Sequence, residues 1–425
     1  MEKKELFKYL IKEFHETALP ELYNRELVIP NTKKIITVVG SRRAGKTFYF
    51  YQLITELMEK IGKERIVYIN FEDDRILPMN FKELYNINEA YYELYPQNKD
   101  KEIYLFLDEI QNIGSWELYI RRIYDKELVK IFITGSNSKL LSKEIATSLR
   151  GRTLNFDIFP LSFKEFLRFN NIQFNKDVFY SKKRFNIKNK FEKYLSLGGF
   201  PEVALEKNNL EHDILNSYYE MIIYRDLAER FRIRNISLLK ALTKFLLTNM
   251  SNLFSLNSYY NTLKETSSVG KETIFEYLSY LEYANVIFLV PLFDYSLKRQ
   301  QANPRKVYCI DNGLRNAVSF KFSGDEGRLA ENLVFVELKR RKKETYYWKN
   351  KGEVDFIIKD NGQDLTAINV AYTDEINKRE TNSLLEFNRK FGKAKELILL
   401  TKDTEKKENN IKFIPLWKWL LNDSN

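Results

Sequence analysis

The sequence predicts an α/β protein of several domains, with a parallel β-sheet in its N-terminal third. The chain has 425 residues, which exceeds one ordinary domain, so we expect two to four compact units. In the first third, short apolar runs alternate with stretches of helical periodicity, which is typical of a parallel sheet covered on both faces. The five predicted strands span residues 35–39, 65–71, 103–107, 130–134 and 154–159.

A glycine-rich loop follows the first predicted strand directly. Residues 40–47 read G-S-R-R-A-G-K-T and complete the pattern G-x-x-x-x-G-K-[ST]. Apolar residues then recur at helical spacing from Phe50 to Leu57, and Gly62 ends the helical pattern. The sequence therefore predicts a strand, a phosphate-binding loop and a helix that together bind a nucleoside triphosphate. A glycine turn that binds nothing is the disfavoured alternative.

The residue types in this loop suit contacts with phosphate and metal. The glycines allow backbone N–H groups to curl around phosphate oxygens, and Lys46 supplies positive charge to the β- and γ-phosphates. Thr47 offers its hydroxyl to Mg²⁺. Arg42 and Arg43 are expected to face acidic groups or a partner rather than phosphate. The residues predicted to line the nucleotide site are Gly40, Ser41, Arg42, Arg43, Ala44, Gly45, Lys46, Thr47 and Phe48.

An acidic pair ends the third predicted strand. Residues 104–107 read Y-L-F-L and lead into Asp108 and Glu109, which is the form of a Walker B strand. Asp108 is predicted to hold Mg²⁺ through water, and Glu109 to polarise the attacking water as a general base. A solvated surface pair is the alternative, which the preceding phosphate loop disfavours. The pair indicates an ATPase rather than a small kinase or GTPase, with ATP and Mg²⁺ as cofactors.

Polar and basic residues near the fourth and fifth strands are further candidates. Ser136 or Asn137, just after the fourth strand, is predicted to orient the water. A capping turn before a helix at Ser138 is the alternative, and both can hold together. Arg152, and after it Arg150, is a candidate for an arginine that reaches a γ-phosphate on a neighbouring subunit. A solvated arginine is the alternative. Action in trans implies a homo-oligomer. The predicted catalytic residues are Lys46, Glu109, Ser136 and Arg152.

Helical and mixed regions follow the sheet. The helical pattern after Pro160 is broken by G-G-F-P at 198–201 and predicts a lid or connector. Three helices and an apolar strand pair near 286–293 then predict a winged helix, with 271–282 as its recognition helix. The basic stretch 296–306 is predicted to be a linker or wing. The predicted domains are the core (1–160), the helical lid (161–235), the winged-helix module (236–300) and an α/β tail (301–425).

In the tail, strands are predicted near 307–310, 345–348, 354–358, 365–370 and 397–400, with helices at 328–341 and 377–391.

Several short motifs occur along the chain, and their combination is more specific than the phosphate loop alone. They are the loop 40–47 with its arginine pair, N-F-E-D at 70–73, L-D-E-I-Q at 107–111, T-G-S at 134–136, G-R at 151–152, P-L-S-F at 160–163, E-F at 165–166, G-G-F-P at 198–201, Y-R-D at 224–226, and Tyr308 with Asp311, Gly313 and Leu314. Over nearly the whole chain, this combination resembles archaeal and bacterial AAA+-like ATPases that carry a C-terminal domain of unknown function related to restriction endonucleases. The resemblance implies an AAA+ (ASCE-type) P-loop core, ATP hydrolysis and a PD-(D/E)XK-like tail.

The nuclease fold that the tail resembles holds Mg²⁺ with a helix Glu, a strand Asp and a Glu-x-Lys on the next strand. Glu331 and Asp355 match the first two positions. At the third, residues 368–372 read I-N-V-A-Y, with neither the carboxylate nor the lysine. The sequence therefore favours an inactive, interaction-type domain. The alternative is a nuclease that uses a displaced ligand such as Glu353.

Charge and composition narrow the function further. The net charge is +11, with 69 basic and 58 acidic residues, which suits either an anionic partner or a highly charged solvated surface. Lys264, Lys271, the basic stretch 296–306 and the cluster 339–343 are candidate DNA contacts. One cysteine and two histidines exclude an intrachain disulfide and the usual zinc sites. No signal peptide or membrane span is predicted, so the expected location is cytoplasmic.

The sequence favours an ATP-hydrolysing, Mg²⁺-dependent switch that couples nucleotide state to binding of DNA or a protein by the C-terminal modules. An ATP-gated nuclease and a nucleotide-sensing scaffold without significant turnover are the alternatives.

Overall fold

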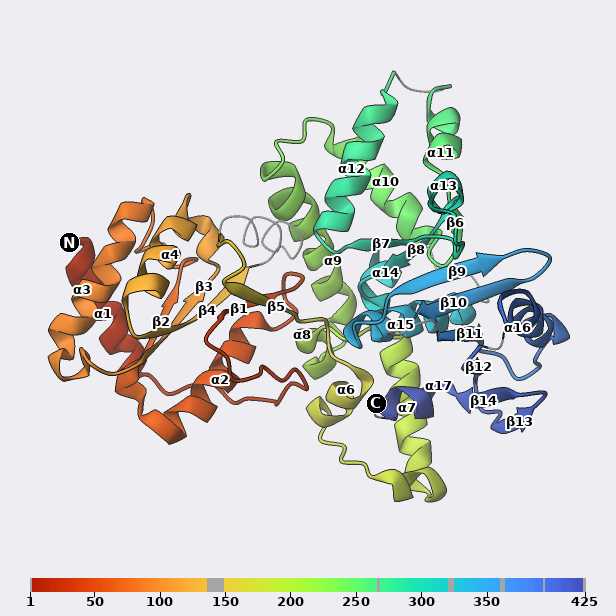
Figure 1. Cartoon of the computed structure of the whole chain (residues 1–425), viewed down its shortest axis with the longest axis horizontal. Coiled ribbons are helices and arrows are strands. Elements are labelled where there is room, and N and C mark those ends of the chain that lie inside the picture. The colour runs from red at the N-terminus through yellow and green to blue at the C-terminus, as the bar shows by residue number, and fades with distance from the viewer. Residues whose placement is uncertain are drawn as a thin grey trace. The chain divides into compact units, whose positions relative to one another are not determined.

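A computed structural model describes residues 2–135, 149–265, 268–319, 325–359, 364–392 and 394–422 (Figure 1). The chain divides into two compact units, Met1–Ile158 and Phe159–Asn425. The finer division of the second unit into lid, winged-helix module and tail stays a prediction.

The first unit is built on a five-stranded parallel sheet. Its strands follow the order β2-β3-β4-β1-β5, and every neighbouring pair is parallel. This confirms the predicted fold class, because strands buried on both faces read as continuous apolar runs. The strands are β1 (Ile35–Val39), β2 (Ile66–Asn70), β3 (Ile103–Asp108), β4 (Val129–Gly135) and β5 (Thr153–Asp157).

Helices cover both faces of this sheet. Ile35 and Val39 of β1 join an apolar cluster with α1, α3 and α4, whereas Ile36 and Val38 join a second cluster with α2. This alternation follows from the period of two residues in a strand. The helices are α1 (Lys3–Glu16), α2 (Lys46–Ile61), α3 (Tyr85–Leu94) and α4 (Trp116–Lys126), with 3₁₀ turns at Lys63–Arg65, Phe81–Leu84, Pro96–Asn98 and Ile110–Asn112.

The second unit begins with the predicted helical region. Its elements are α6 (Phe163–Phe169), a 3₁₀ helix (Lys176–Tyr180), α7 (Lys183–Leu197), α8 (Pro201–Leu205), α9 (Glu211–Met221) and a π-helix (Ile222–Glu229). The Ser162 hydroxyl and the Glu165 carboxylate cap α6 reciprocally. Pro201 lies in the first turn of α8, where a backbone N–H would have no partner within the helix. Proline, which lacks this N–H, therefore fits there.

A small antiparallel sheet with helices follows. Its elements are α10 (Ile236–Thr248), β6 (Leu253–Phe254), α11 (Leu256–Leu263), α12 (Lys271–Tyr283), β7 (Ile287–Val290), α13 (Leu297–Ala302) and β8 (Arg305–Cys309). The strand order is β6-β8-β7.

Two sequence predictions are wrong here. The strand pair expected near 286–293 contains only β7, because the following residues turn to β9, where Phe293 N–H donates to the Tyr347 carbonyl at 2.6 Å. The second strand of the pair is β8, which was predicted near 307–310 as part of the tail. The stretch 296–306 was predicted to be a linker or wing; it contains α13 and the start of β8, so the linker alternative is wrong and the wing stays a prediction.

The last part of the chain forms a six-stranded mixed sheet in the order β13-β14-β12-β11-β10-β9. β11, β12 and β14 are parallel, and the other neighbours are antiparallel. The elements are α14 (Asn312–Val318), α15 (Glu326–Arg340), β9 (Thr345–Lys349), β10 (Glu353–Lys359), β11 (Leu365–Ala371), α16 (Lys378–Phe391), β12 (Glu396–Thr401), β13 (Lys406–Glu408), β14 (Ile411–Pro415) and α17 (Leu416–Leu421). The sequence did not predict β13, β14 or α17.

Candidate functional site

The phosphate loop joins the end of β1 to the start of α2. A Cβ atom on Gly40 would lie 2.2 Å from the carbonyl oxygen of Ile158, so only glycine fits. Gly45 has φ +95°, a conformation that side chains with a Cβ rarely adopt. The two glycines of the motif are therefore required by the backbone itself.

Lys46 begins α2 and is buried. Its Nζ lies 3.4 Å from the Gly40 carbonyl oxygen, 3.3 Å from the Ser41 carbonyl oxygen and 3.4 Å from Oε1 of Glu109. A buried ammonium is stabilised only when it has such partners. The lysine therefore points back over its own loop and toward the end of β3.

Asp108 ends β3 and is fully buried. Its Oδ2 accepts hydrogen bonds from the Thr47 hydroxyl at 2.6 Å and from the Tyr68 hydroxyl at 3.1 Å, and its Oδ1 accepts one from the Thr134 hydroxyl. Burial raises the pKa of the Asp108 carboxyl above its ordinary value. The structure thus brings together Thr47 and Asp108, the two predicted metal-binding residues.

Glu109 follows in a left-handed conformation, with φ +53°. Its backbone N–H donates to the Thr134 hydroxyl oxygen at 2.9 Å, and its Oε2 accepts a hydrogen bond from the Gln111 side chain. Burial acts to raise the pKa of the Glu109 carboxyl, but Lys46, Gln111 and Arg42 outweigh it and leave the pKa below its ordinary value. Glu109 is therefore ionised at neutral pH, and both its oxygens have partners.

These groups fit a nucleotide with Mg²⁺. Among the described residues, the Ser41 hydroxyl in the loop and the Gln111 side-chain oxygen are buried without a hydrogen-bond partner. Buried polar atoms in proteins almost always have one. The pairing of a threonine hydroxyl with an aspartate suits Mg²⁺, which prefers oxygen ligands.

The sequence missed Thr134 and Tyr68 as members of this cluster. Thr134 is the penultimate residue of β4, and the carboxyl ends of parallel strands meet at one edge of the sheet, so its position was available as a signal. Tyr68 lies in the middle of β2, where nothing in the sequence marks it. The predicted sensors Ser136 and Asn137 lie outside the described residues.

The other loop residues take separate positions. Arg42 pairs with Glu72 at 3.2 Å between Nη1 and Oε1, as expected of a loop arginine that faces an acidic group. Ala44 is buried, and Phe48 is 54% exposed on the first turn of α2.

The two candidate arginines lie near the start of β5. Ile35 N–H donates to the Arg152 carbonyl at 2.9 Å, so Arg152 is at the amino edge of the sheet, opposite the phosphate loop of its own chain. Its guanidinium makes two hydrogen bonds of 3.1 Å to Asp125. Arg150 is exposed. A role for either arginine at a neighbouring subunit's nucleotide stays a prediction.

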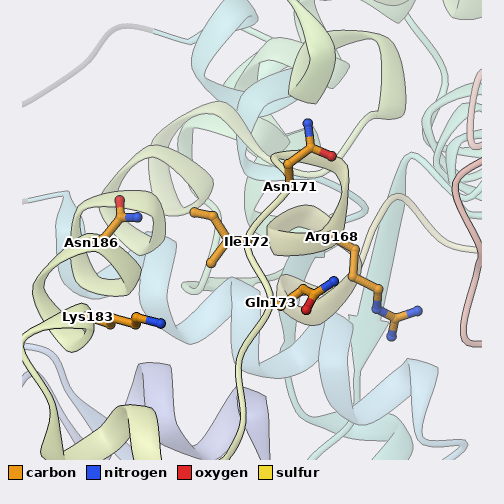
Figure 2. Close-up of a pocket in the computed structure, with 6 residues that line it drawn as sticks. All are labelled: Arg168, Asn171, Ile172, Gln173, Lys183 and Asn186. Carbon is orange, nitrogen blue, oxygen red and sulfur yellow. The ribbon is translucent and has the colours of Figure 1, made fainter.

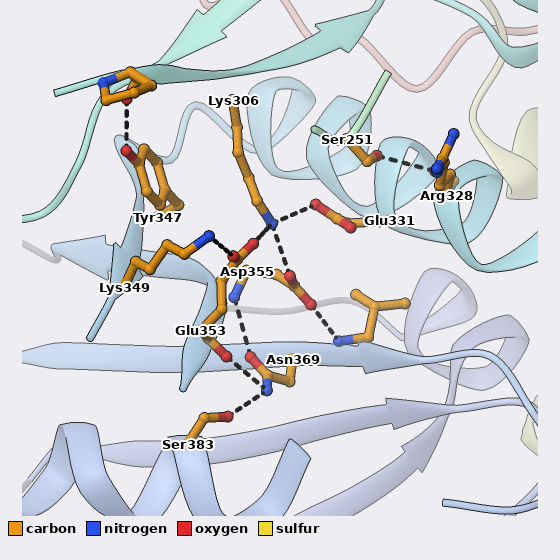
Figure 3. Close-up of polar contacts among 12 residues, drawn as sticks. Ser251, Lys306, Arg328, Glu331, Tyr347, Lys349, Glu353, Asp355, Asn369 and Ser383 are labelled. Atoms are coloured by element: carbon orange, nitrogen blue, oxygen red, sulfur yellow. Dashed lines mark hydrogen bonds and ion pairs between the residues drawn. The ribbon is translucent and has the colours of Figure 1, made fainter. Parts of the chain in front are cut away.

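A second cluster of charged side chains lies in the tail (Figure 3). Glu331 on α15 and Asp355 on β10, the two residues that match the nuclease pattern, lie together with Glu353 around the Nζ of Lys306. Burial, then the Asp355 charge, raises the pKa of Glu331 to about 8. Lys306 was predicted only as the last residue of the basic stretch 296–306, a candidate for DNA contacts. It is instead buried on β8 and pairs with these carboxylates, outside the motif that the resemblance supplies.

Several remaining motifs prove to be structural. Asp311 accepts hydrogen bonds from the backbone N–H groups of Gly199 at 2.6 Å and Leu314 at 3.1 Å, and a Cβ atom on Gly198 would lie 2.0 Å from its Oδ1. Burial raises the pKa of the Asp311 carboxyl to about 6. The G-G-F-P and Asp311 motifs thus tie the end of α7 to the start of α14.

A hollow of about 490 Å³ lies between the end of α6 and the start of α7 (Figure 2). Its lining contains two cationic side chains and no carboxylate. The lining residues are Arg168, Asn171, Ile172, Gln173, Lys183 and Asn186. None of the predicted site residues is among them.

Comparison with known proteins agrees with the geometry of the core. Residues 32–167 match an AAA domain, residues 188–325 match a domain of unknown function (DUF8612), and residues 326–419 match another (DUF4143). Over 99% of this chain and 96% of that protein, the sequence is 40% identical to MJ1544 of Methanocaldococcus jannaschii, described as uncharacterized. The chain belongs to the MJ1544 family.

A Haemophilus influenzae protein, also described as uncharacterized, is 31% identical over 94% of this chain and 98% of its own length. Among solved structures, the Walker-type ATPase PABY2304 of Pyrococcus abyssi has a TM-score of 0.44 at 15% identity, covering 75% of this chain and 96% of that one. The five-stranded parallel sheet lies entirely within residues 32–167, which match the AAA domain. In the described parts of the chain, no helix is both long and apolar enough to cross a membrane.

Proposed function

We propose that this protein is a Mg²⁺-dependent ATPase that acts as a switch, with C-terminal modules that bind DNA or a protein partner. The observation that carries the proposal is the meeting of Lys46, Thr47, Asp108 and Glu109 at one edge of the parallel sheet. This set supplies a cation for phosphate, two oxygens for a metal and a carboxylate for a water molecule.

In the proposed mechanism, the loop N–H groups and Lys46 bind the phosphates. Thr47 and Asp108 would hold Mg²⁺, which would supply charge neutralisation at the phosphates. The Thr134 hydroxyl donates a hydrogen bond to the Asp108 carboxylate and accepts one from the backbone N–H of Glu109. Thr134 therefore positions both acidic residues.

The ion pair between Lys46 and Glu109 suggests how the site stays inactive without nucleotide. Phosphate oxygens compete for the Lys46 ammonium, because they carry more negative charge than a single carboxylate. When Lys46 turns to phosphate, Oε1 of Glu109 becomes available to accept a proton from water. In this mechanism, nucleotide binding itself frees the general base.

The output of the switch is assigned to the second unit. The order α10, β6, α11, α12, β7, α13 and β8, with β8 between the other two strands, supports a winged-helix interpretation of this region, in which α13 lies in the connection between β7 and β8. Phe275 on α12 is 59% exposed, and basic Lys271 begins the same helix. Glu272 and Glu276 dilute the positive charge, so a protein partner is as compatible with this surface as DNA.

The decisive experiment measures phosphate release from ATP with and without Mg²⁺, for the natural protein and for Lys46→Ala. We expect Mg²⁺-dependent turnover that Lys46→Ala abolishes together with ATP binding. Turnover equal to that of Lys46→Ala would instead support a nucleotide-sensing scaffold. A DNA titration at increasing salt, with and without ATP, tests the output, because phosphate contacts weaken as salt rises.

A further inference from the structure

Lys306 lies at the centre of three carboxylates in the second unit (Figure 3). Its Nζ is 3.0 Å from Oε1 of Glu331, 2.7 Å from Oε1 of Glu353 and 2.9 Å from Oδ1 of Asp355. The side chain is 2% exposed. An ammonium has three N–H donors, and here each has a carboxylate oxygen within hydrogen-bond distance.

The carboxylates come from elements that are distant in the sequence. Glu331 is on α15, Glu353 and Asp355 are on β10, and Lys306 is on β8. The Tyr308 hydroxyl donates to the same oxygen of Glu331 at 2.6 Å. A buried charge needs such pairing, since desolvation is costly. The arrangement therefore stabilises a cation at this point, and the chain supplies that cation itself.

The resemblance to nucleases implies a divalent metal at this place, but the residues do not fit one. Asn369 stands where a carboxylate is expected. Its Oδ1 accepts a hydrogen bond from the Asp355 N–H at 3.0 Å, and its Nδ2 donates to the Ser383 hydroxyl at 2.9 Å. The second Asp355 oxygen accepts a hydrogen bond from the Val370 N–H at 2.9 Å.

The lysine of the Glu-x-Lys pattern is also absent, because Ala371 stands at its position. Within the ranges that the structure describes, no three His, Cys, Asp or Glu side chains come together as a metal-ligand set.

We propose that the Lys306 ammonium permanently takes the place of a divalent cation among Glu331, Glu353 and Asp355, so that this cluster binds no metal and cuts no DNA. The cluster instead has a structural role, which is to connect elements of the second unit. Lys306 is in register with Leu253 of β6 and Val290 of β7, so its side chain connects the three-stranded sheet to α15 and β10. A compact ammonium suits this role, because it replaces the charge of a metal without requiring its coordination geometry.

The test is a Mn²⁺ titration, followed by the electron paramagnetic resonance of free Mn²⁺, without nucleotide. All proteins carry Asp108→Asn, which replaces the carboxylate that is proposed to hold a metal in the core. With Lys306 present, we expect no Mn²⁺ binding that depends on Asp355. Lys306→Ala is expected to bind one Mn²⁺ at least tenfold more tightly, and adding Asp355→Asn is expected to abolish that binding.

Stability supplies a second readout. Lys306→Ala removes the ammonium at the centre of the three carboxylates, and Glu353 keeps its pairing with Lys349 at 3.3 Å. The melting temperature is therefore expected to fall and to recover when Mn²⁺ is added. Lys306→Met with Asp355→Asn, which lowers the excess negative charge, is the matched control and is expected to show no Mn²⁺ response.

Two results would overturn the proposal. One is that protein with Lys306 in place binds Mn²⁺, or cleaves plasmid DNA with Mn²⁺, and that Asp355→Asn abolishes this binding or cleavage. The other is a folded Lys306→Ala protein that takes up no Mn²⁺. The first arm needs no variant at position 306, so the proposal can be refuted even where Lys306→Ala fails to fold. Neither arm depends on ATP hydrolysis by the core.

Discussion

Replacing Glu109 with glutamine tests the proposed general base at almost constant side-chain volume. Glu109 is 8% exposed, and its two oxygens face Lys46 and Gln111. Glutamine keeps one acceptor oxygen but places an NH₂ group next to an existing donor and cannot take a proton from water. It also loses the charge that attracts Lys46. Nucleotide binding should therefore persist or tighten while hydrolysis fails.

The expected size follows from the role. General base catalysis contributes about 10²–10⁴-fold, which corresponds to about 3–5 kcal/mol in the barrier at 1.36 kcal/mol for each factor of ten. Phosphate release at saturating ATP measures the rate, and calorimetric titration measures ATP affinity. Glu102→Gln, an exposed carboxylate just before β3, is the control that should leave both unchanged. Turnover within threefold of the natural protein in Glu109→Gln would show that another group activates the water.

Three further predictions follow from other contacts. Thr134→Val leaves the buried Glu109 N–H without its acceptor, so unfolding in urea should show a loss of about 1–3 kcal/mol, and ATP turnover should fall; unchanged stability would contradict the assigned contact. Gly198→Ala should lower the free energy of unfolding in urea by about 2–6 kcal/mol, because the strain at φ +76° and the clash with Asp311 add. Gly392→Ala is the control: its φ is +87°, and among the described residues, its chain neighbours aside, no atom lies within 4 Å of the new Cβ, so only the backbone part of about 1–3 kcal/mol should be lost. Equal losses would refute the clash. Burial raises the pKa of Asp311 to about 6, so the protonated carboxyl stabilises the folded state at a pH below the unfolded pKa. This contribution, up to about 3 kcal/mol, should be lost as pH rises through 6. The free energy of unfolding in urea should therefore differ less between pH 4.5 and pH 7 for Asp311→Asn than for the natural protein, and equal differences would contradict the shift.

The core was predictable because its signals are local. β1 matches its predicted bounds, and β2, β3 and β4 differ by one residue at one or both ends, since a strand buried on both faces must be apolar throughout. β5 is the edge strand and is largely exposed, and its predicted bounds are shifted by one residue at its start and two at its end. The phosphate loop and the acidic pair are contiguous in the chain, and their meeting follows from the rule that parallel strands end at one edge.

The second unit was harder to predict because its pairings are not local. The strand after β7 was misplaced, since residues 291–293 pair with Tyr347 more than fifty residues later. β8 was assigned to the tail because an apolar run does not say which sheet it joins. The G-G-F-P motif was read as a break between helices, and its contact with Asp311 depends on residues over a hundred positions apart.

By itself the sequence determined the sheet, the loop, the Walker B pair and the absence of Glu-x-Lys in the tail, because each is a statement about neighbouring residues. Only the tertiary structure decided that Lys46 pairs with Glu109, that Thr134 holds both acidic residues and that Lys306 lies among three carboxylates. The physical reason is the same in each case. A buried charged or polar group is stabilised by whatever opposite charge or hydrogen-bonding group the fold brings within about 3 Å, and sequence distance has no bearing on that choice.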